Sequence, residues 1–394
     1  MATRKQRAII VGAGIVGAAS AFFLSRAGFE VKVVEAAAPA SAASGAADGA
    51  VSVASKRPGP LMEAAIRGVE TYRELTAQGV LAGCFGERST FMLAQDTDED
   101  AVLDGHAQSL VRSGVEIRHH GRREVRALMP VLSPQVRSAV EVRREGHAIG
   151  YRIVDRLLAA SGAMVLRGCR VDGFVTDGAA TRVTALDTAA GALEADVAVL
   201  AAGNGSAALL GLAGVLRPRK GQLYVTERAA ALNAGLPGSL MSCRYLMSKD
   251  STDRRMAAEG QEDGGRRFGL VIDPLKTGQF LIGGTREETD VHGTDLAALR
   301  LLLGEAVAMV PALAGVRLIR AFSGIRTATA DGRPLIGRAP GFANLIVATG
   351  FEGDGICLGP VTGRVVSELA RGMTPAIALE PFDPGRFAAA ERAA

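Results

Sequence analysis

The sequence predicts a two-domain protein of mixed α/β and α+β class, with one Rossmann-like domain and a second domain built on an antiparallel sheet. Three observations support this fold class. A strand, a glycine turn, a helix and a second strand follow one another over 7–35, which is the βαβ unit of Rossmann-like folds. Short strand-like segments separated by turn residues recur over 163–205 and 218–320, a pattern typical of antiparallel sheets. A chain of 394 residues is long enough for two or three domains.

The composition excludes several classes of protein. The 45 basic and 41 acidic residues leave a net charge of +4, and 48% of the residues are hydrophobic, which is typical of a globular chain. Aromatic residues make up only 4% and Trp is absent, so we predict no nucleic-acid partner. The apolar run 8–24 is interrupted by Gly12, Gly14 and Gly17, and we predict neither a signal peptide nor a membrane span.

Cysteine and histidine spacing predicts that there is no metal site. The four cysteines lie far apart, and the five histidines include only one adjacent pair, His119 and His120. Adjacent side chains point apart on a helix or a strand, so this pair is unsuited to chelation. The cysteines show no disulfide pattern either, so we expect a cytoplasmic location, where cysteines stay reduced.

The apolar pattern predicts the elements in order. Arg7 to Val11 is a strand, apolar residues recur at helical spacing from Ile15, and Gly28 is placed to end that helix. Val31 to Val34 forms the second strand, which ends at Glu35. Later in the chain we expect strands at 164–166, 171–175, 197–201, 222–226, 279–282 and 345–348, helices at 296–310 and through 361–369, a loop at 260–267 and a glycine-rich turn at 350–355.

The glycine turn after the first strand predicts a dinucleotide site. Gly12, Gly14 and Gly17 form a G-x-G-x-x-G pattern, in which the missing side chains let a pyrophosphate approach backbone amides and the positive end of the helix. Glu35 follows Gly12 by 35 − 12 = 23 residues, where an acidic side chain can accept hydrogen bonds from a ribose. NAD and FAD both use this fold, and glycines that serve only helix–strand packing remain the alternative.

Four further motifs, in order, resemble the D-amino-acid oxidase family of FAD-dependent flavoproteins, which includes glycine oxidase and sarcosine oxidase. They are 43–50 (ASGAADGA), 193–203 (LEADVAVLAAG), 324–326 (GIR) with 331–337 (DGRPLIG), and 348–356 (ATGFEGDGI). The resemblance covers most of the chain and implies FAD as the cofactor. It implies a glutathione-reductase-type FAD-binding domain made of 1–85, 146–214 and 322–394, and a substrate-binding domain made of 86–145 and 215–321.

The resemblance also implies which residues contact the cofactor. Reduced flavin carries negative charge near N1 and O2, and a helix N-terminus stabilises an anion by about 0.3–1 kcal/mol, so we expect the turn at 350–355 to face the isoalloxazine ring. A capping turn without such a role is the alternative. Val171 matches the residue whose backbone meets the adenine in similar proteins. The expected cofactor-binding residues are Gly12, Gly14, Ile15, Val16, Gly17, Glu35, Ala36, Ser44, Asp48, Gly49, Ala50, Val171, Ala202, Gly203, Glu352, Gly353, Asp354, Gly355 and Ile356.

Arg326 and Tyr245 are the predicted catalytic residues. A guanidinium can hold a substrate carboxylate through charge-assisted hydrogen bonds worth about 1.5–3 kcal/mol, and Arg326 matches the family position for that contact. Tyr245 lies in the region expected to supply the substrate domain and could place a hydroxyl in the pocket. A salt bridge for Arg326 and core filling for Tyr245 are the alternatives. Lys56 and Lys220 also fall in family motifs, but the favoured interpretation is two solvated lysines.

Within the family, the segment 47–60 resembles most the β subunits of heteromeric dehydrogenases for opines, D-hydroxyproline or proline, a branch that also contains a hydrogen cyanide synthase subunit. The segments 352–356 and 244–246 agree with this branch, whereas Phe351 stands where a His is expected. The resemblance implies oxidation of an amino or imino acid to the imine by hydride transfer to flavin. It also implies an α subunit as electron-transfer partner, with an iron–sulfur subunit and an FMN at a subunit interface in some relatives.

Three alternatives to this function stay open. The first is a stand-alone oxidase of glycine, sarcosine or a D-amino acid that passes electrons to oxygen. The second is a flavin-carrying assembly subunit without catalytic activity, for which Phe351 is the only indication. The third is an NAD-dependent amino-acid or opine dehydrogenase. The motif at 193–203 and the helix expected through 361–369 make it the least favoured.

Overall fold

The predicted βαβ unit is present in the computed structural model, which describes residues 4–212, 214–249 and 267–387. Strand β1 (Arg7–Val11) pairs in parallel with β2 (Glu30–Glu35) and with β13 (Val197–Leu200), and α1 (Ile15–Arg26) follows β1. Both faces of β1 are buried. Ala8 and Ile10 belong to one core, and Ile9 and Val11 belong to another on the opposite face. This burial on two faces explains why the strand is a continuous apolar run.

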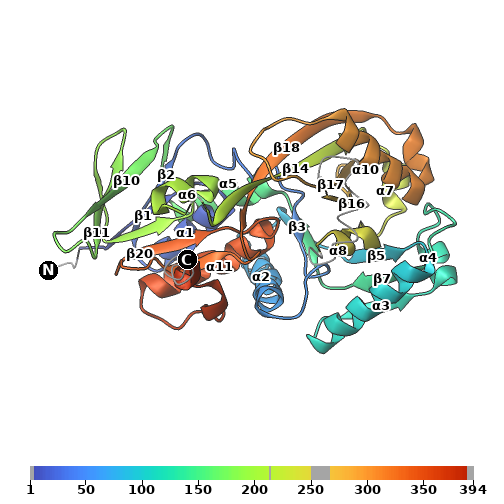
Figure 1. Cartoon of the computed structure of the whole chain (residues 1–394), viewed down its shortest axis with the longest axis horizontal. Coiled ribbons are helices and arrows are strands. Elements are labelled where there is room, and N and C mark those ends of the chain that lie inside the picture. The colour runs from blue at the N-terminus through green and yellow to red at the C-terminus, as the bar shows by residue number, and fades with distance from the viewer. Residues whose placement is uncertain (1–3, 213, 250–266, 388–394) are drawn as a thin grey trace.

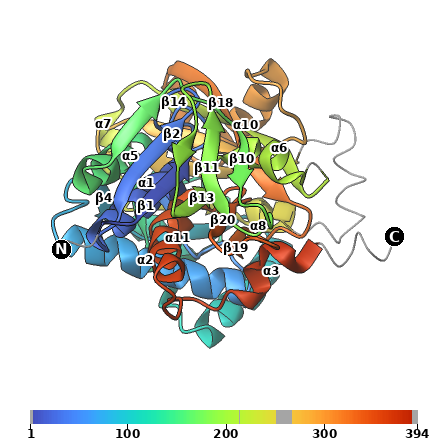
Figure 2. The ribbon, with the colours of Figure 1, turned by 90° about the vertical axis from the view of Figure 1, so that its left-hand side faces the viewer.

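The first lobe, at the left of Figure 1, is built around a six-stranded sheet. Its strands are parallel except for β19, which runs antiparallel to β20. Helix α1 packs against α5 and α11, α11 packs against α2, and a three-stranded antiparallel sheet contributes to the core on the other face. Figure 2 shows β2, β1 and β13 crossing the middle of this lobe. The sheet order is β19 (Leu335–Arg338), β20 (Leu345–Thr349), β13, β1, β2 and β9 (Met164–Arg167). The helices of this lobe named above are α2 (Pro60–Ala77), α5 (Gly150–Ser161) and α11 (Gly355–Ala370). The small sheet contains β10 (Val171–Thr176), β11 (Val183–Thr188) and β12 (Leu193–Glu194).

An eight-stranded sheet forms the second lobe. Neighbouring strands are antiparallel, as predicted, with the exception of β5 and β15, which are parallel. Strands from 90–142, 216–286 and 318–329 share this sheet, and the predicted domain boundary between 321 and 322 falls inside its edge strand. The division into domains stays a prediction. The sheet order is β18 (Leu318–Thr329), β14 (Leu216–Thr226), β17 (Phe280–Arg286), β16 (Arg267–Pro274), β15 (Ser239–Ser242), β5 (Thr90–Ala94), β7 (Ser138–Val142) and β6 (Ile117–His120).

Helices cover both faces of this second sheet. Helix α10 (Leu296–Met309) packs against β16 and β17, and α4 (Arg122–Leu128) packs against β6 and β7. The Asp295 carboxylate caps α10 by accepting a hydrogen bond from the Ala298 amide at 2.9 Å, which satisfies one of the unpaired donors of the first turn. The helix predicted at 296–310 is therefore confirmed. Helix α3 (Thr97–Arg112) packs against β5, β6 and β7 from the opposite face. The other two helices of this lobe, α7 (Ala230–Ala234) and α8 (Cys243–Lys249), are short.

A three-stranded sheet lies at the junction of the lobes and connects segments that are far apart in the chain. It contains β3 (Ala50–Val51), β8 (Gly146–Ala148) and β4 (Phe85–Glu87). Within the described ranges, no helix is both long and apolar enough to cross a membrane. The loop predicted at 260–267 falls, apart from Arg267, outside the described residues. The remaining elements are α6 (Ser206–Leu210), η1 (Gly203–Gly205), η3 (Pro311–Gly315), η4 (Glu380–Phe382) and η5 (Pro384–Phe387).

Candidate cofactor and substrate site

The glycine turn between β1 and α1 lies directly against the end of β13. Gly12 has a φ of 101°, and a Cβ at this position would lie 2.5 Å from the carbonyl oxygen of Ala201. A Cβ on Gly17 would lie 1.9 Å from the carbonyl oxygen of Gly12. These two glycines are therefore needed for close packing of strand, turn and helix, while Gly14 is the N-cap of α1 and provides no capping side chain. The packing leaves the first turn of α1 facing a cavity.

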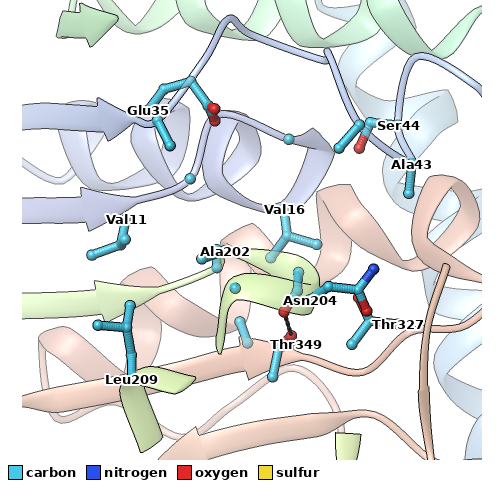
Figure 3. A pocket seen from close by; sticks show the side chains of 18 of the residues that line it. Val11, Val16, Glu35, Ala43, Ser44, Ala202, Asn204, Leu209, Thr327 and Thr349 are labelled. Atoms are coloured by element: carbon cyan, nitrogen blue, oxygen red, sulfur yellow. Dashed lines mark hydrogen bonds between the residues drawn. The ribbon is translucent and has the colours of Figure 1, made fainter. Parts of the chain in front are cut away.

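This cavity has a volume of about 590 Å³ and is lined by segments from the whole length of the first lobe. Glu35 and Ser44 lie on one side of it, and Asn204, Thr327 and Thr349 lie on the other (Figure 3). The Thr349 hydroxyl donates to the carbonyl oxygen of Gly203 at 3.2 Å, which connects the end of β20 to the turn after β13. The motifs at 193–203 and 348–356 are thus joined at this one cavity.

Hydrogen bonds to the backbone fix Glu35 and Ser44 at the glycine turn. The Ala13 amide donates to one carboxylate oxygen of Glu35 at 2.8 Å, and the Ala37 amide donates to the other at 2.9 Å. The Ile15 amide donates to the Ser44 hydroxyl at 3.0 Å. A carboxylate has about four lone-pair sites, so Glu35 retains capacity to accept hydrogen bonds from a ribose.

Most of the predicted cofactor residues gather at two adjoining cavities. Gly17, Gly49, Ala50 and Asp354 do not line either one; Gly17 packs the turn from behind. Those at the large cavity are Gly12, Gly14, Ile15, Val16, Glu35, Ala36, Ser44, Val171, Ala202, Gly203, Glu352 and Gly355, and Asp48, Gly353 and Ile356 lie at a smaller cavity that also shares Ile15, Ser44, Glu352 and Gly355.

These residues fit an FAD. The turn at Gly12 brings backbone and a helix N-terminus to the cavity, which suits the pyrophosphate. Glu35 suits the ribose hydroxyls, and Val171 would meet the adenine. The sixteen-residue helix α11 begins at Gly355, next to Gly353, so its N-terminus suits the electron-rich edge of a reduced flavin.

The smaller cavity contains both predicted catalytic residues. It has a volume of about 80 Å³ and is lined by Tyr245 from α8 and Arg326 from β18, among others. The Arg326 guanidinium crosses β14 and donates to the Thr285 carbonyl on β17 at 3.1 Å. It can do so because β14 has a glycine there: a Cβ on Gly221 would lie 2.4 Å from an Arg326 nitrogen. Gly221 is thus part of the site, although it was not among the predicted site residues.

Arg286, at the end of β17, is a second guanidinium at this cavity and was not among the predicted site residues. It donates to the Tyr245 hydroxyl at 3.0 Å, and its guanidinium carbon lies 4.8 Å from the centre of the Tyr245 ring. Its side chain is only 10% exposed. Burial acts against its charge, but Tyr245 and Glu352 raise the pKa of Arg286 above its ordinary value. Arg286 is therefore a permanent cation at the site.

Glu352 is the common counter-ion of three arginines. One of its carboxylate oxygens lies 3.5 Å from Arg286, 3.8 Å from Arg326 and 3.6 Å from Arg219. Arg219 also pairs with Glu288 at 2.7 Å and lines neither cavity. Glu352 has a φ of 48°, which is uncommon for a residue other than glycine and is often found at functional sites. Its expected role as a backbone contact for the flavin is thus accompanied by an electrostatic one.

The interpretation of Lys56 and Lys220 as solvated lysines is wrong. Lys56 is 5% exposed and lies 2.7 Å from the Asp354 carboxylate, and Lys220 is 8% exposed and lies 3.0 Å from Glu287. Burial disfavours the charge of Lys56, but Asp354 raises the pKa of this ammonium above its ordinary value. Both lysines are therefore held by partners that come from distant parts of the chain, which spacing along the sequence does not reveal.

Phe351 occupies a buried position where the resemblance led us to expect a histidine. It is 9% exposed, belongs to the apolar core of the first lobe and lines the large cavity. A phenyl ring provides neither a hydrogen-bond donor nor a titratable group. A proton-transfer role of a histidine at this position is thus absent from this chain.

A third cavity, of about 920 Å³, adjoins the other two. The segment 40–48 contributes to the lining of all three cavities. Four basic residues line the third one: Arg88, Arg152, Lys276 and Arg320. This cavity could therefore accept an anionic group within reach of the segment that borders the cofactor site.

Comparison with known proteins agrees with this geometry. A family model described as DAO, FAD dependent oxidoreductase, matches residues 7–369. The glycine oxidase of Pseudomonas aeruginosa PAO1 is 28% identical over 396 residues, which cover 96% of this chain and 98% of that protein. The hydrogen cyanide synthase subunit HcnC of the same organism is 26% identical over 329 residues, covering 81% of this chain and 71% of that protein.

The fold is shared with solved structures. The crystal structure of L-proline dehydrogenase from P. horikoshii superposes with a TM-score of 0.83, covering 98% of this chain and 99% of that one, at 20% sequence identity. At this identity the similarity establishes the fold alone. The predicted fold class, a Rossmann-like cofactor domain with a sheet-based second domain, is confirmed.

Proposed function

The chain belongs to the FAD-dependent oxidoreductase family, and from this premise we propose that it oxidises a small amino or imino acid at its C–N bond. FAD-dependent oxidation of an amino-acid-type substrate is the coarse function, and it is shared with the glycine oxidases. One observation carries the proposal for the site: Arg326 and Tyr245 line a small cavity that shares Glu352 and Gly355 with the cofactor cavity. A substrate there would adjoin both the guanidinium and the flavin.

The side chains of this cavity bind and orient the substrate. Arg326 would hold the carboxylate bidentately, and its contact with the Thr285 carbonyl fixes the direction of the guanidinium. The volume of about 80 Å³ suits the part of a substrate that carries the carboxylate and the reacting carbon. The bound flavin supplies the acceptor for the hydride that leaves the carbon next to nitrogen. The imine that forms is then hydrolysed.

The test is anaerobic titration of the purified chain with proline, hydroxyprolines, opines, sarcosine, glycine and D-amino acids, with flavin absorbance as the readout. We expect at least one of them to bleach the flavin. Arg326→Lys keeps the charge but loses the bidentate geometry, so we expect kcat/KM for that substrate to fall about tenfold to a hundredfold.

Arg143→Lys, on an arginine whose side chain is 52% exposed, is the matched control and should behave as the wild type. Unchanged bleaching in Arg326→Lys would contradict the role of Arg326. It would favour the alternative of a flavin-carrying subunit without catalytic activity.

The finer proposal is that the chain is the β subunit of a heteromeric dehydrogenase of the opine, D-hydroxyproline or proline type. It is supported by the motif at 47–60 and by the similarity to HcnC, which is itself named as a subunit. An α subunit, with an iron–sulfur subunit in some assemblies, would carry electrons onward. The cavity of about 920 Å³, whose lining contains Arg152, Lys276 and Arg320 beside Asp48 and Glu87, has the size for the FMN that we expect at a subunit interface.

The second candidate is a stand-alone oxidase, which the similarity to glycine oxidase over 396 residues favours. Reoxidation of the substrate-reduced chain separates the two. If the chain is a dehydrogenase subunit, we expect slow reoxidation by air and fast reoxidation by an artificial electron acceptor, and FMN in addition to FAD when the chain is isolated with its partners. Fast reoxidation by air alone would identify the oxidase.

A further inference from the structure

We propose that Arg286 forms a second anion subsite beside Arg326, so that the preferred substrate is a secondary amine with two carboxylates. The inference rests on the proposed function, because it concerns the substrate of the same cavity. It narrows the amino and imino acids considered above to those with an acidic group on both sides of the nitrogen.

Two guanidiniums face one small cavity, although a single α-carboxylate needs only one. Arg286 is on β17 and Arg326 on β18, and the strand between them, β14, has Gly221 at the point where Arg326 crosses it. Both side chains line the cavity. Arg286 is fixed by its hydrogen bond of 3.0 Å to Tyr245 and by stacking over that ring at 4.8 Å. A pre-oriented guanidinium loses little entropy when it binds a carboxylate.

Glu352 already occupies the place of a carboxylate between these two cations. Its oxygen lies 3.5 Å from Arg286 and 3.8 Å from Arg326, so an anionic oxygen lies at ion-pair distance from both guanidiniums. The same oxygen lies 3.6 Å from Arg219, which is outside the cavity lining. When substrate binds, Glu352 can therefore retain Arg219 as its partner and release Arg286 and Arg326 to ligand carboxylates.

The other charged groups close to the cavity have partners elsewhere. Asp48, the second acidic residue in its lining, accepts a hydrogen bond from the Ala50 amide at 3.1 Å. Lys56 pairs with Asp354 and Lys220 pairs with Glu287. The cations that face the ligand are thus Arg286 and Arg326. Two carboxylates of a dianionic ligand would pair with them, while Glu352 shares Arg219 with Glu288.

Sarcosine and iminodiacetate form a matched pair of probes, because both are N-substituted glycines and the second differs by a carboxylate on the N-substituent. We expect wild-type kcat/KM for flavin reduction to be at least about tenfold higher for iminodiacetate. In Arg286→Met the ratio of the two values should fall about tenfold or more. In Arg326→Met both values should fall together, since Arg326 holds the carboxylate that the two substrates share.

A wild type that prefers sarcosine, or an Arg286→Met variant with an unchanged ratio, would overturn the proposal. An equal loss for both substrates would also overturn it, because Arg286 would then act only by positioning Tyr245. Arg286→Lys serves if the methionine variant does not fold, and it should retain part of the preference because it keeps the charge. If no amine reduces the flavin, the proposed function fails. The subsite is then decided by whether iminodiacetate perturbs the flavin spectrum in the wild type more strongly than in the Arg286 variant.

Discussion

Gly12→Ala is expected to abolish stable FAD binding. The substitution combines two penalties: a φ of 101°, which disfavours any L side chain, and a Cβ placed 2.5 Å from the Ala201 carbonyl oxygen. The clash would separate the turn after β1 from the turn after β13, and these two adjoining turns both line the cofactor cavity. We expect the ratio of flavin to protein absorbance to fall at least about tenfold, since a shift of about 1.4 kcal/mol already changes an equilibrium constant tenfold and strained backbone costs about 1–3 kcal/mol.

Gly28→Ala is the matched control for backbone strain. Gly28 has a similar φ of 93°, but nothing lies within 4 Å of a Cβ added there. This variant should lose about 1 kcal/mol of unfolding free energy and retain its FAD. If Gly12→Ala kept a full complement of flavin, or if both variants lost flavin equally, the close packing at Ala201 would not be what shapes the site.

Local patterns were sufficient to predict the cofactor half of the molecule. The apolar run at 7–11, the glycines of the following turn and the acidic residue at 35 lie within one short βαβ unit, in which sequence neighbours are also neighbours in space. The buried faces of β1 explain its lack of alternation. Family motifs then identified the turns at 202–203 and 350–355, which do line the large cavity.

The substrate half depends on pairings that local patterns do not encode. Arg286 and Arg326 become neighbours only through the strand order β18, β14, β17. Lys56 and Asp354 are 298 residues apart in the chain, and spacing alone gave no reason to pair them. Gly221 and Gly324 are register partners on β14 and β18. This pair of glycines was the one feature of the sequence that could have indicated the close approach of Arg326 to β14. Glycines inside strands often mark a close approach of another group, but the strand expected at 222–226 began one residue after Gly221.

Lys56→Met is expected to destabilise the protein by about 3–5 kcal/mol, because removal of one partner leaves the other charge buried. The side chains of Lys56 and Asp354 are 4% and 18% exposed, and their charged atoms are 2.7 Å apart. The pKa of Lys56 is raised above its ordinary value of 10.5. The contribution of its charge is therefore complete below that value and is lost only as the pH rises through the raised pKa. Chemical denaturation at neutral pH measures the loss.

The same substitution should make the flavin harder to reduce. Asp354 lies between Gly353 and Gly355, which line the substrate and cofactor cavities, so an uncompensated carboxylate there disfavours the additional negative charge of reduced flavin. We expect the midpoint potential of bound FAD to become more negative in Lys56→Met. In the double variant Lys56→Met, Asp354→Asn the unpaired charge is gone, and both stability and potential should return most of the way to wild type. A double variant that is as impaired as Lys56→Met would mean that the packing of the Lys56 stem, and not its charge, supports the start of α11.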